Sequence, residues 1–205
     1  MSTYASLTQD IQDFAENDDT EFTTEIDGFI LRAEERIFRE TPFLPVFRAE
    51  NTGTLTASTS TLTMPSGKRT IRSFSITVSS SEVFLQQRLD SYLKDVYPNA
   101  ATEGQPKYYA EKDDTTLLVG PTPDSNYSYT IWAHEQPTGL SSGNTTTWLS
   151  SNVEDVLLFA AMVEATAFLK HPEAAAEWTA RYAQALQSLQ NEMGRNLGNE
   201  NTVGA

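Results

Sequence analysis

The sequence contains no cysteine, few basic residues and no apolar run long enough to cross a membrane. With no cysteine among its 205 residues, it forms no disulfide, thiolate metal site or thiol nucleophile, which fits a reducing compartment. Only 14 Lys and Arg oppose 28 Asp and Glu, and the net charge of -14 argues against nucleic-acid binding. The most apolar segment, residues 153–169, is too short to span a bilayer and contains three acids, which indicates a core helix.

The beginning of the sequence is especially poor in basic residues. Residues 1–17 have neither the basic nor the apolar region of a secretory signal, so we expect the protein to remain in the cell that makes it. Before residue 28 there are eight acids and no Lys or Arg. Such a run is typical of a solvated helical face, and the alternative is a surface that faces a basic patch on another protein.

The sequence shows no pattern that carries catalytic chemistry. Its two histidines, His134 at an expected strand end and His171 at an expected turn between helices, are interpreted as structural residues. Residues 111–116 are acidic but lack the ligand spacing and the glycine of a calcium loop. We therefore predict no catalytic residue, cofactor, metal site or enzymatic activity. A pair of glycosidase carboxylates is left open, because their separation is a spatial property.

Hydrophobic periodicity predicts two helices near the N-terminus. The first covers about residues 7–16. The second begins with a capping pair, Asp18 and Glu21, and continues as one apolar stripe until Pro42 and Pro45 stop it.

The second helix carries two further signals. Gly28 lies inside it, which indicates either a close approach by a neighbouring backbone or simple tolerance of the glycine. On the outer face two oppositely charged pairs stand four residues apart, and we expect both to form: Glu35 with Arg39, and Arg36 with Glu40.

The middle of the chain has a different apolar period. From residue 47 to residue 136 the period is two and Thr and Ser are frequent, which predicts a β-rich subdomain. We expect turns at residues 65–68 and 112–114 and a short helix over residues 89–98. Five aromatic side chains that could stack sugars or bases are interpreted mainly as strand core and rim: Tyr108, Tyr109, Tyr127, Tyr129 and Trp132.

Two more helices are predicted near the C-terminus. Ser151 and Glu154 form the pattern of a capping box at the start of the most apolar segment, which we expect to be buried on nearly all sides. Pro172 opens a last helix, and its periodicity ends at Met193, where Gly194 provides a stop.

This helical hairpin and the segment after it supply the residues that we expect to contact partner proteins. An antiparallel hairpin can bury one broad face and still leave Trp178 and Tyr182 near its rim. Residues 194–205 carry little apolar surface, so they should form a flexible arm with Leu197 and Val203 as its two apolar anchors. These four residues are the predicted partner interface.

Together these patterns predict an α+β protein, in which a bundle of about four helices from both chain ends carries an inserted β-rich subdomain. The N-terminal helices of the bundle should occupy residues 1–46 and the β-rich insertion residues 47–147. The C-terminal helical hairpin should occupy residues 148–193, followed by the flexible arm at residues 194–205.

Residues 129–189 resemble the end of the adaptor, or head-to-tail connector, proteins of tailed and especially short-tailed bacteriophages. The shared order is an apolar strand, a proline, a Leu-Ser turn, an Asn-Thr-rich link, a buried Ala/Leu helix and a helix with Trp, Arg and Tyr. The matching positions are Ile131, Trp132, Pro137, Leu140, Ser141, Asn144, Trp148, Leu149, Asp155, Leu157, Glu164, Ala165, Trp178, Tyr182, Leu186 and Leu189. Residues 22–40 also look like the first long helix of such proteins.

The resemblance implies a structural virion protein of the tail or neck, made in the host cytoplasm. It would form a ring, expected to be twelvefold, that joins the portal protein to the tail or nozzle proteins. DNA would pass through the channel without specific binding, which suits an acidic chain. The alternatives are another virion component, such as a head-completion or tail protein, and a carbohydrate-binding module that uses the aromatic β region.

Overall fold

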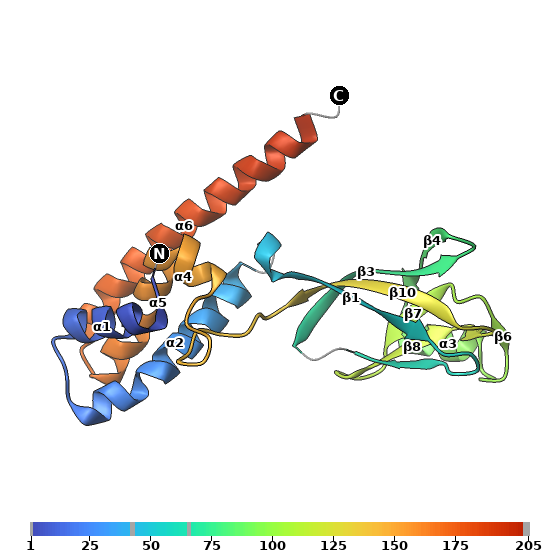
Figure 1. The fold of residues 1–205 in the computed structure, drawn as a ribbon, viewed down its shortest axis with the longest axis horizontal. Coiled ribbons are helices and arrows are strands. Elements are labelled where there is room, and N and C mark those ends of the chain that lie inside the picture. The colour runs from blue at the N-terminus through green and yellow to red at the C-terminus, as the bar shows by residue number, and fades with distance from the viewer. Residues whose placement is uncertain (1, 42–43, 65–66, 203–205) are drawn as a thin grey trace. The chain divides into compact units, whose positions relative to one another are not determined.

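The computed structural model describes residues 2–41, 44–64 and 67–202, and it confirms the α+β class (Figure 1). The chain divides into two compact units, a helical unit of Met1–Val46 with Pro137–Ala205 and a β unit of Phe47–Gln136. The helical unit therefore comes from both ends of the chain, as the change of apolar period along the sequence predicts. Residues 137–147, expected in the insertion, group with the helical unit instead.

The helical unit begins with two amphipathic helices, α1 (Tyr4–Ala15) and α2 (Thr20–Glu40). Thr3 caps α1 through a reciprocal capping box with Ser6, in which each hydroxyl accepts the backbone N–H of the other residue. Leu7 and Ile11 of α1 are buried, and in α2 the buried stripe comprises Phe22, Ile26, Phe29, Ile30, Ala33, Ile37 and Phe38.

One expectation for α2 is wrong, and one alternative that the sequence left open is decided. Its N-cap is Asp19 rather than Asp18, because the side chain of Asn17 accepts the backbone N–H of Asp19 at 2.9 Å and shapes the turn one residue later. Gly28 does not mark a close approach by a neighbour. A Cβ there would first meet the guanidinium of Arg32, a flexible side chain of the same helix, at 3.2 Å, so the glycine is merely tolerated.

Three helices follow residue 147: α4 (Trp148–Asn152), α5 (Glu154–Phe168) and α6 (Pro172–Thr202). The expected capping box of Ser151 and Glu154 is wrong. The box forms one helix earlier, where Thr147 caps α4 and Ser150 completes the reciprocal pair, while α5 starts without a side-chain cap. Ser150 is fully buried, so packing selects Ser150 rather than the neighbouring Ser151 as a member of the capping box.

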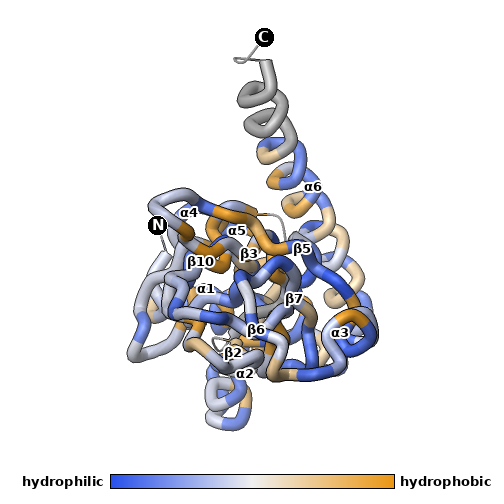
Figure 2. Tube along the Cα trace, turned by 90° about the vertical axis from the view of Figure 1, so that its right-hand side faces the viewer, coloured by the Kyte–Doolittle hydropathy of each residue, from blue (hydrophilic) through white to orange (hydrophobic). Residues whose placement is uncertain are grey.

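α5 is the central element of the helical unit. It packs against α1, α2, α4 and α6, and Figure 2 colours the described chain by the hydropathy of its residues. It is less enclosed than its composition predicts, because Leu158, Phe159 and Val163 remain partly exposed. Its buried residues are Val156, Leu157, Ala160, Ala161, Met162, Ala165 and Thr166.

A tight turn joins α5 to α6 and makes them an antiparallel hairpin, as predicted. The backbone N–H groups of Lys170 and His171 donate to the carbonyls of Ala167 and Thr166, both at 3.1 Å, which is the Schellman pattern of a helix end. Lys170 takes the left-handed conformation, with φ of 58°. His171 then opens α6, because its carbonyl accepts the N–H of Ala175 at 2.9 Å.

α6 does not end at Met193 as its apolar periodicity predicts. The helical backbone continues to Thr202, through Gly194 and Gly198. A glycine in a helix interior costs only about 1 kcal/mol relative to alanine. Glycine therefore permits a helix end here without enforcing one.

The β unit contains a four-stranded antiparallel sheet and a second four-stranded sheet. The first has the order β1-β10-β3-β4, from strands Arg48–Leu55, Tyr127–Glu135, Lys68–Val78 and Ser81–Phe84. The second has the order β2-β8-β7-β5, from Thr61–Thr63, Thr116–Gly120, Tyr108–Glu111 and Gln86–Gln87. A small parallel pair joins β6 (Glu103–Gly104) to β9 (Thr122–Pro123), α3 spans Asp90–Val96, and a 3-10 turn at Pro45–Phe47 precedes β1.

Both sheets contribute to one apolar core, in which Phe74 and Ile131 of the first sheet join Leu117 and Val119 of the second. The predicted bend at residues 112–114 is confirmed, since β7 and β8 pair antiparallel across it. The strands that flank residues 65–68, however, belong to different sheets, because β2 pairs with β8.

Candidate functional site

The sequence-predicted interface residues Trp178 and Tyr182 lie inside the helical unit. Trp178 is 9% exposed, and its ring packs against Phe14 of α1 and Phe159 of α5, with centroid distances of 5.5 and 5.7 Å. The guanidinium of Arg181 lies 4.8 Å from the Trp178 ring centroid. Tyr182 is 5% exposed. Their contact with a partner stays a prediction, and the side chains of Leu197 and Val203 lie outside the described part of the structure.

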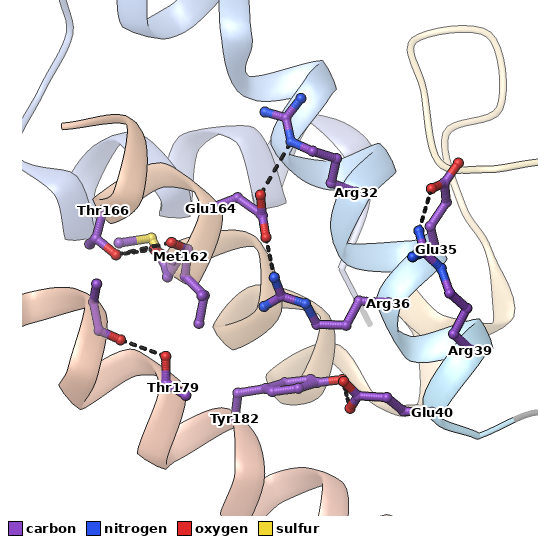
Figure 3. Close-up of polar contacts among 12 residues, drawn as sticks. Arg32, Glu35, Arg36, Arg39, Glu40, Met162, Glu164, Thr166, Thr179 and Tyr182 are labelled. Atoms are coloured by element: carbon purple, nitrogen blue, oxygen red, sulfur yellow. Dashed lines mark hydrogen bonds and ion pairs between the residues drawn. The ribbon is translucent and has the colours of Figure 1, made fainter. Parts of the chain in front are cut away.

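A polar cluster connects α2, α5 and α6 next to Tyr182 (Figure 3). Arg32 and Arg36 of α2 both donate to the carboxylate of Glu164 on α5, the first from Nε at 3.3 Å. The Tyr182 hydroxyl donates to Glu40 Oε2 at 2.7 Å. Of the two expected helix-surface pairs, Glu35–Arg39 forms at 2.8 Å. The other does not form, because Arg36 contacts Glu164 on α5 and Glu40 accepts the hydroxyl of Tyr182 on α6.

The environment of Tyr182 keeps its hydroxyl protonated. Burial, and then the hydrogen bond to Glu40, raise the pKa of Tyr182 far above its ordinary value. The phenol therefore stays neutral and acts as a hydrogen-bond donor from α6 to the end of α2. Such a contact orients the last helix rather than supplying a nucleophile or a base.

Beside this cluster lies a concave pocket of about 330 Å³. The residues that line it are Arg32, Arg36, Arg39, Glu40 and Glu164. From the sequence, Arg36 and Arg39 are expected only as members of surface pairs, and Arg32 has no predicted role. The signal that could have found the pocket is the spacing of the three arginines, which places them along one side of α2.

A second buried carboxylate, Glu34, organises the loop before α4. Both of its oxygens accept the backbone N–H of Leu140, at 3.1 and 3.0 Å. Burial raises the pKa of Glu34 to about 7, although hydrogen bonds from Leu140 and Thr147 oppose the shift. Gly139 is required beside it, since a Cβ there would lie 2.5 Å from Glu34 Oε2.

The two histidines occupy structural positions. His134 is buried in β10, and burial, with the nearby charges of Arg72 and Arg48, lowers its pKa so that it stays neutral at pH 7. His171 is exposed at the turn between α5 and α6. Within the described ranges, no group of three potential His, Asp or Glu ligands is placed to hold a metal ion.

The aromatic residues of the β unit divide between core and surface. Tyr109 and Tyr129 are buried against Phe74, with ring centroids 5.3 and 5.8 Å from it. Trp132 is 40% exposed and Tyr108 is half-buried against Tyr92. The residues that sequence reasoning considered for stacking sugars are thus largely used for packing.

Among the helices of the described chain, none combines the length and apolarity needed to cross a membrane. No curated protein matches the sequence. The model of one protein family, described as SU10 adaptor protein, matches residues 2–203. This match covers both units and confirms the resemblance to phage adaptors. The chain therefore belongs to the SU10 adaptor protein family and is a phage structural protein.

Proposed function

We propose that the protein is a subunit of a ring, twelvefold in symmetry, that joins the portal to the tail of a virion. The family match over residues 2–203 carries this proposal, because it covers the helical unit and the β unit together. The portal protein would contact one side of the ring, and tail or nozzle proteins the other. The protein would be made in the host cytoplasm and reside in the neck of the virion.

Features of the helical unit support side-by-side packing of copies. Phe14 and Phe168 are 54% and 37% exposed, and Leu158 on α5 is partly exposed. Exposed aromatic side chains on a rigid bundle are typical of protein interfaces. Trp178 and Tyr182 would lie beneath this surface, and the Trp178 ring would hold Phe14 in place, since the two rings pack edge-on.

The charge of the chain suits passage of DNA through the ring. A channel wall must let the duplex slide, and positive charge would hold its phosphates. With a net charge of -14 the protein offers no general attraction to DNA. We propose that DNA passes the subunits without specific contacts.

Association with the portal tests the proposed function. Mass photometry of the full chain at rising concentration, with and without portal rings, should show a cyclic oligomer or its assembly on the portal. Electron microscopy of the complex would then count the copies. A chain that stays monomeric and never joins a portal ring would overturn the proposal.

A further inference from the structure

Three arginines gather at one place on an acidic protein, in a pocket that Glu40 and Glu164 also line. Arg32, Arg36 and Arg39 follow one another at intervals of four and three residues on α2 and line the pocket of about 330 Å³ described above. The side chains of Arg32 and Arg39 are 49% and 67% exposed. The whole chain has only 14 basic residues and a net charge of -14, so this arginine pocket, with its exposed arginines, is a candidate to receive an acidic partner.

Contacts inside the helical unit hold the guanidinium groups in position and leave donors for further partners. Arg32 donates to Glu164 through its Nε group alone, and Figure 3 shows the two Nη groups of Arg32 directed away from that carboxylate. Glu35 engages one Nη group of Arg39. A guanidinium carries five N–H donors in a planar fork that can pair with both oxygens of a carboxylate. The arginine pocket can therefore bind carboxylates beyond those that already line it.

The opposite end of α2 carries the opposite charge. The last turn of α1 and the link to α2 form an acidic turn, in which Asp13, Glu16 and Asp18 are exposed, and among the described residues none of these three forms an ion pair. At a rise of about 1.5 Å per residue, the start of α2 lies roughly 24 Å along the helix from Arg36. The arginine pocket and this acidic turn of one copy therefore cannot neutralise each other.

We propose that the arginine pocket of one copy receives the acidic turn of a second copy. The inference rests on the proposed ring and names the surfaces through which its subunits meet. Contact between two different patches can be heterologous, in which case it repeats around an axis and closes into a ring. A two-fold dimer would instead make the same contact twice, reciprocally, so the number of copies in the assembly separates the two arrangements. Complementary charges at such an interface fix the orientation of neighbours and weaken as salt screens them.

Charge reversal on either side tests the contact. One variant carries Arg32→Glu with Arg39→Glu, leaving Arg36 on Glu164, and the other carries Asp13→Lys with Asp18→Lys. Each alone should weaken self-association about tenfold or more, because like charges then face each other. An equimolar mixture of the two variants should assemble again, since glutamates of one now meet lysines of the other. A chain with all four substitutions should also assemble.

Controls separate this contact from other effects. Lys94→Glu removes an exposed (i, i+4) pair with Asp90 on the β unit and should leave assembly unchanged. Circular dichroism should show that every variant is folded. If the wild type forms rings but the reversals do not weaken them, or the mixture does not recover, the contact is wrong while the ring remains. If the arginine variant loses only portal binding, the pocket's partner is the portal and the proposal fails. A wild type that neither self-associates nor assembles on portal rings overturns both proposals.

Discussion

Glu34, in the middle of α2, accepts the backbone N–H of Leu140 with both carboxylate oxygens, at 3.1 and 3.0 Å. Asn144 holds the same loop by donating to the carbonyls of Thr138 and Gly139, at 3.0 and 2.9 Å. These bonds tie the segment before α4 to a helix more than a hundred residues earlier in the chain. The loop is therefore an ordered part of the helical unit.

The burial of Glu34 predicts a pH-dependent stability. Its folded pKa of about 7 exceeds the ordinary value of 4.5, so between these values the folded state keeps a proton that the unfolded chain releases. The stabilisation from this group is complete below about pH 4.5 and is lost as the pH rises through about 7. Urea unfolding followed by helical circular dichroism should show less pH dependence for Glu34→Gln than for the wild type. An equal slope in both proteins would contradict the prediction.

The contact of Glu34 with the loop predicts that Gly139 is intolerant of a side chain. Gly139→Ala would place a methyl group 2.5 Å from Glu34 Oε2 and displace the carboxylate from the Leu140 N–H. We expect a loss of about 1–3 kcal/mol in the free energy of unfolding, as for a buried polar group deprived of its partner. Gly143→Ala is the matched control, because open space surrounds that position. Equal stabilities of the two variants would argue against the contact.

The central position of α5 predicts a large effect of truncating its core. Leu157 has no exposed surface, so Leu157→Ala should cost about 2–5 kcal/mol through lost burial and an unfilled cavity. Phe159→Ala should lie toward the lower end of this range, because Phe159 is partly exposed although it packs against Trp178. Leu158→Ala, at another partly exposed position, should cost less than Leu157→Ala. Chemical denaturation measures all three, and a loss near zero for Leu157 would remove α5 from the core.

The histidine positions predict that neither residue serves catalysis. His171→Ala changes an exposed turn, and His134→Ala removes a side chain that is buried in β10. Both variants should still assemble on portal rings, although His134→Ala should melt at a lower temperature because it leaves a cavity. Abolished function in a variant that remains folded would reopen a catalytic interpretation.

The C-terminal segment is predicted to strengthen docking. A chain ending at Met193 should keep its melting temperature, because Leu186 and Leu189, the last buried apolar residues described on α6, remain. It should bind portal rings more weakly if the removed residues reach a partner or an adjacent subunit. Titration of portal rings with the full and the shortened chain compares the two affinities. Equal affinities would mean that the segment after Met193 has no role in docking.

The local elements of this fold follow from patterns within the sequence. Leu7 and Ile11 recur at helical spacing and are buried in α1, and the bend at residues 112–114 joins β7 to β8 as predicted. Such patterns suffice because an amphipathic helix or a hairpin is specified by residues a few positions apart. The phage-adaptor family was also recognisable at this level, from the order of short segments between residues 129 and 189.

Tertiary packing decided which of several local possibilities is used. Ser151 and Glu154 satisfy the capping pattern, yet the box forms between Thr147 and Ser150. Arg36 is spaced to pair with Glu40, yet it contacts Glu164 on another helix. In both cases the local pattern is satisfied by the sequence, and packing against other parts of the helical unit selects a different partner.

Contacts between distant residues were beyond sequence reasoning. From the sequence, Glu34 is expected to be one more surface acid of an amphipathic helix, and only the fold brings the backbone N–H of Leu140 to it. The arginine pocket, too, exists because α5 places Glu164 opposite Arg32 and Arg36. The sequence alone determined most of the helices, the β-rich character of the middle region and the family, because these depend on short-range periodicity and order. The tertiary structure decided the buried carboxylate and the arginine pocket, because hydrogen bonds and ion pairs depend on distances in space.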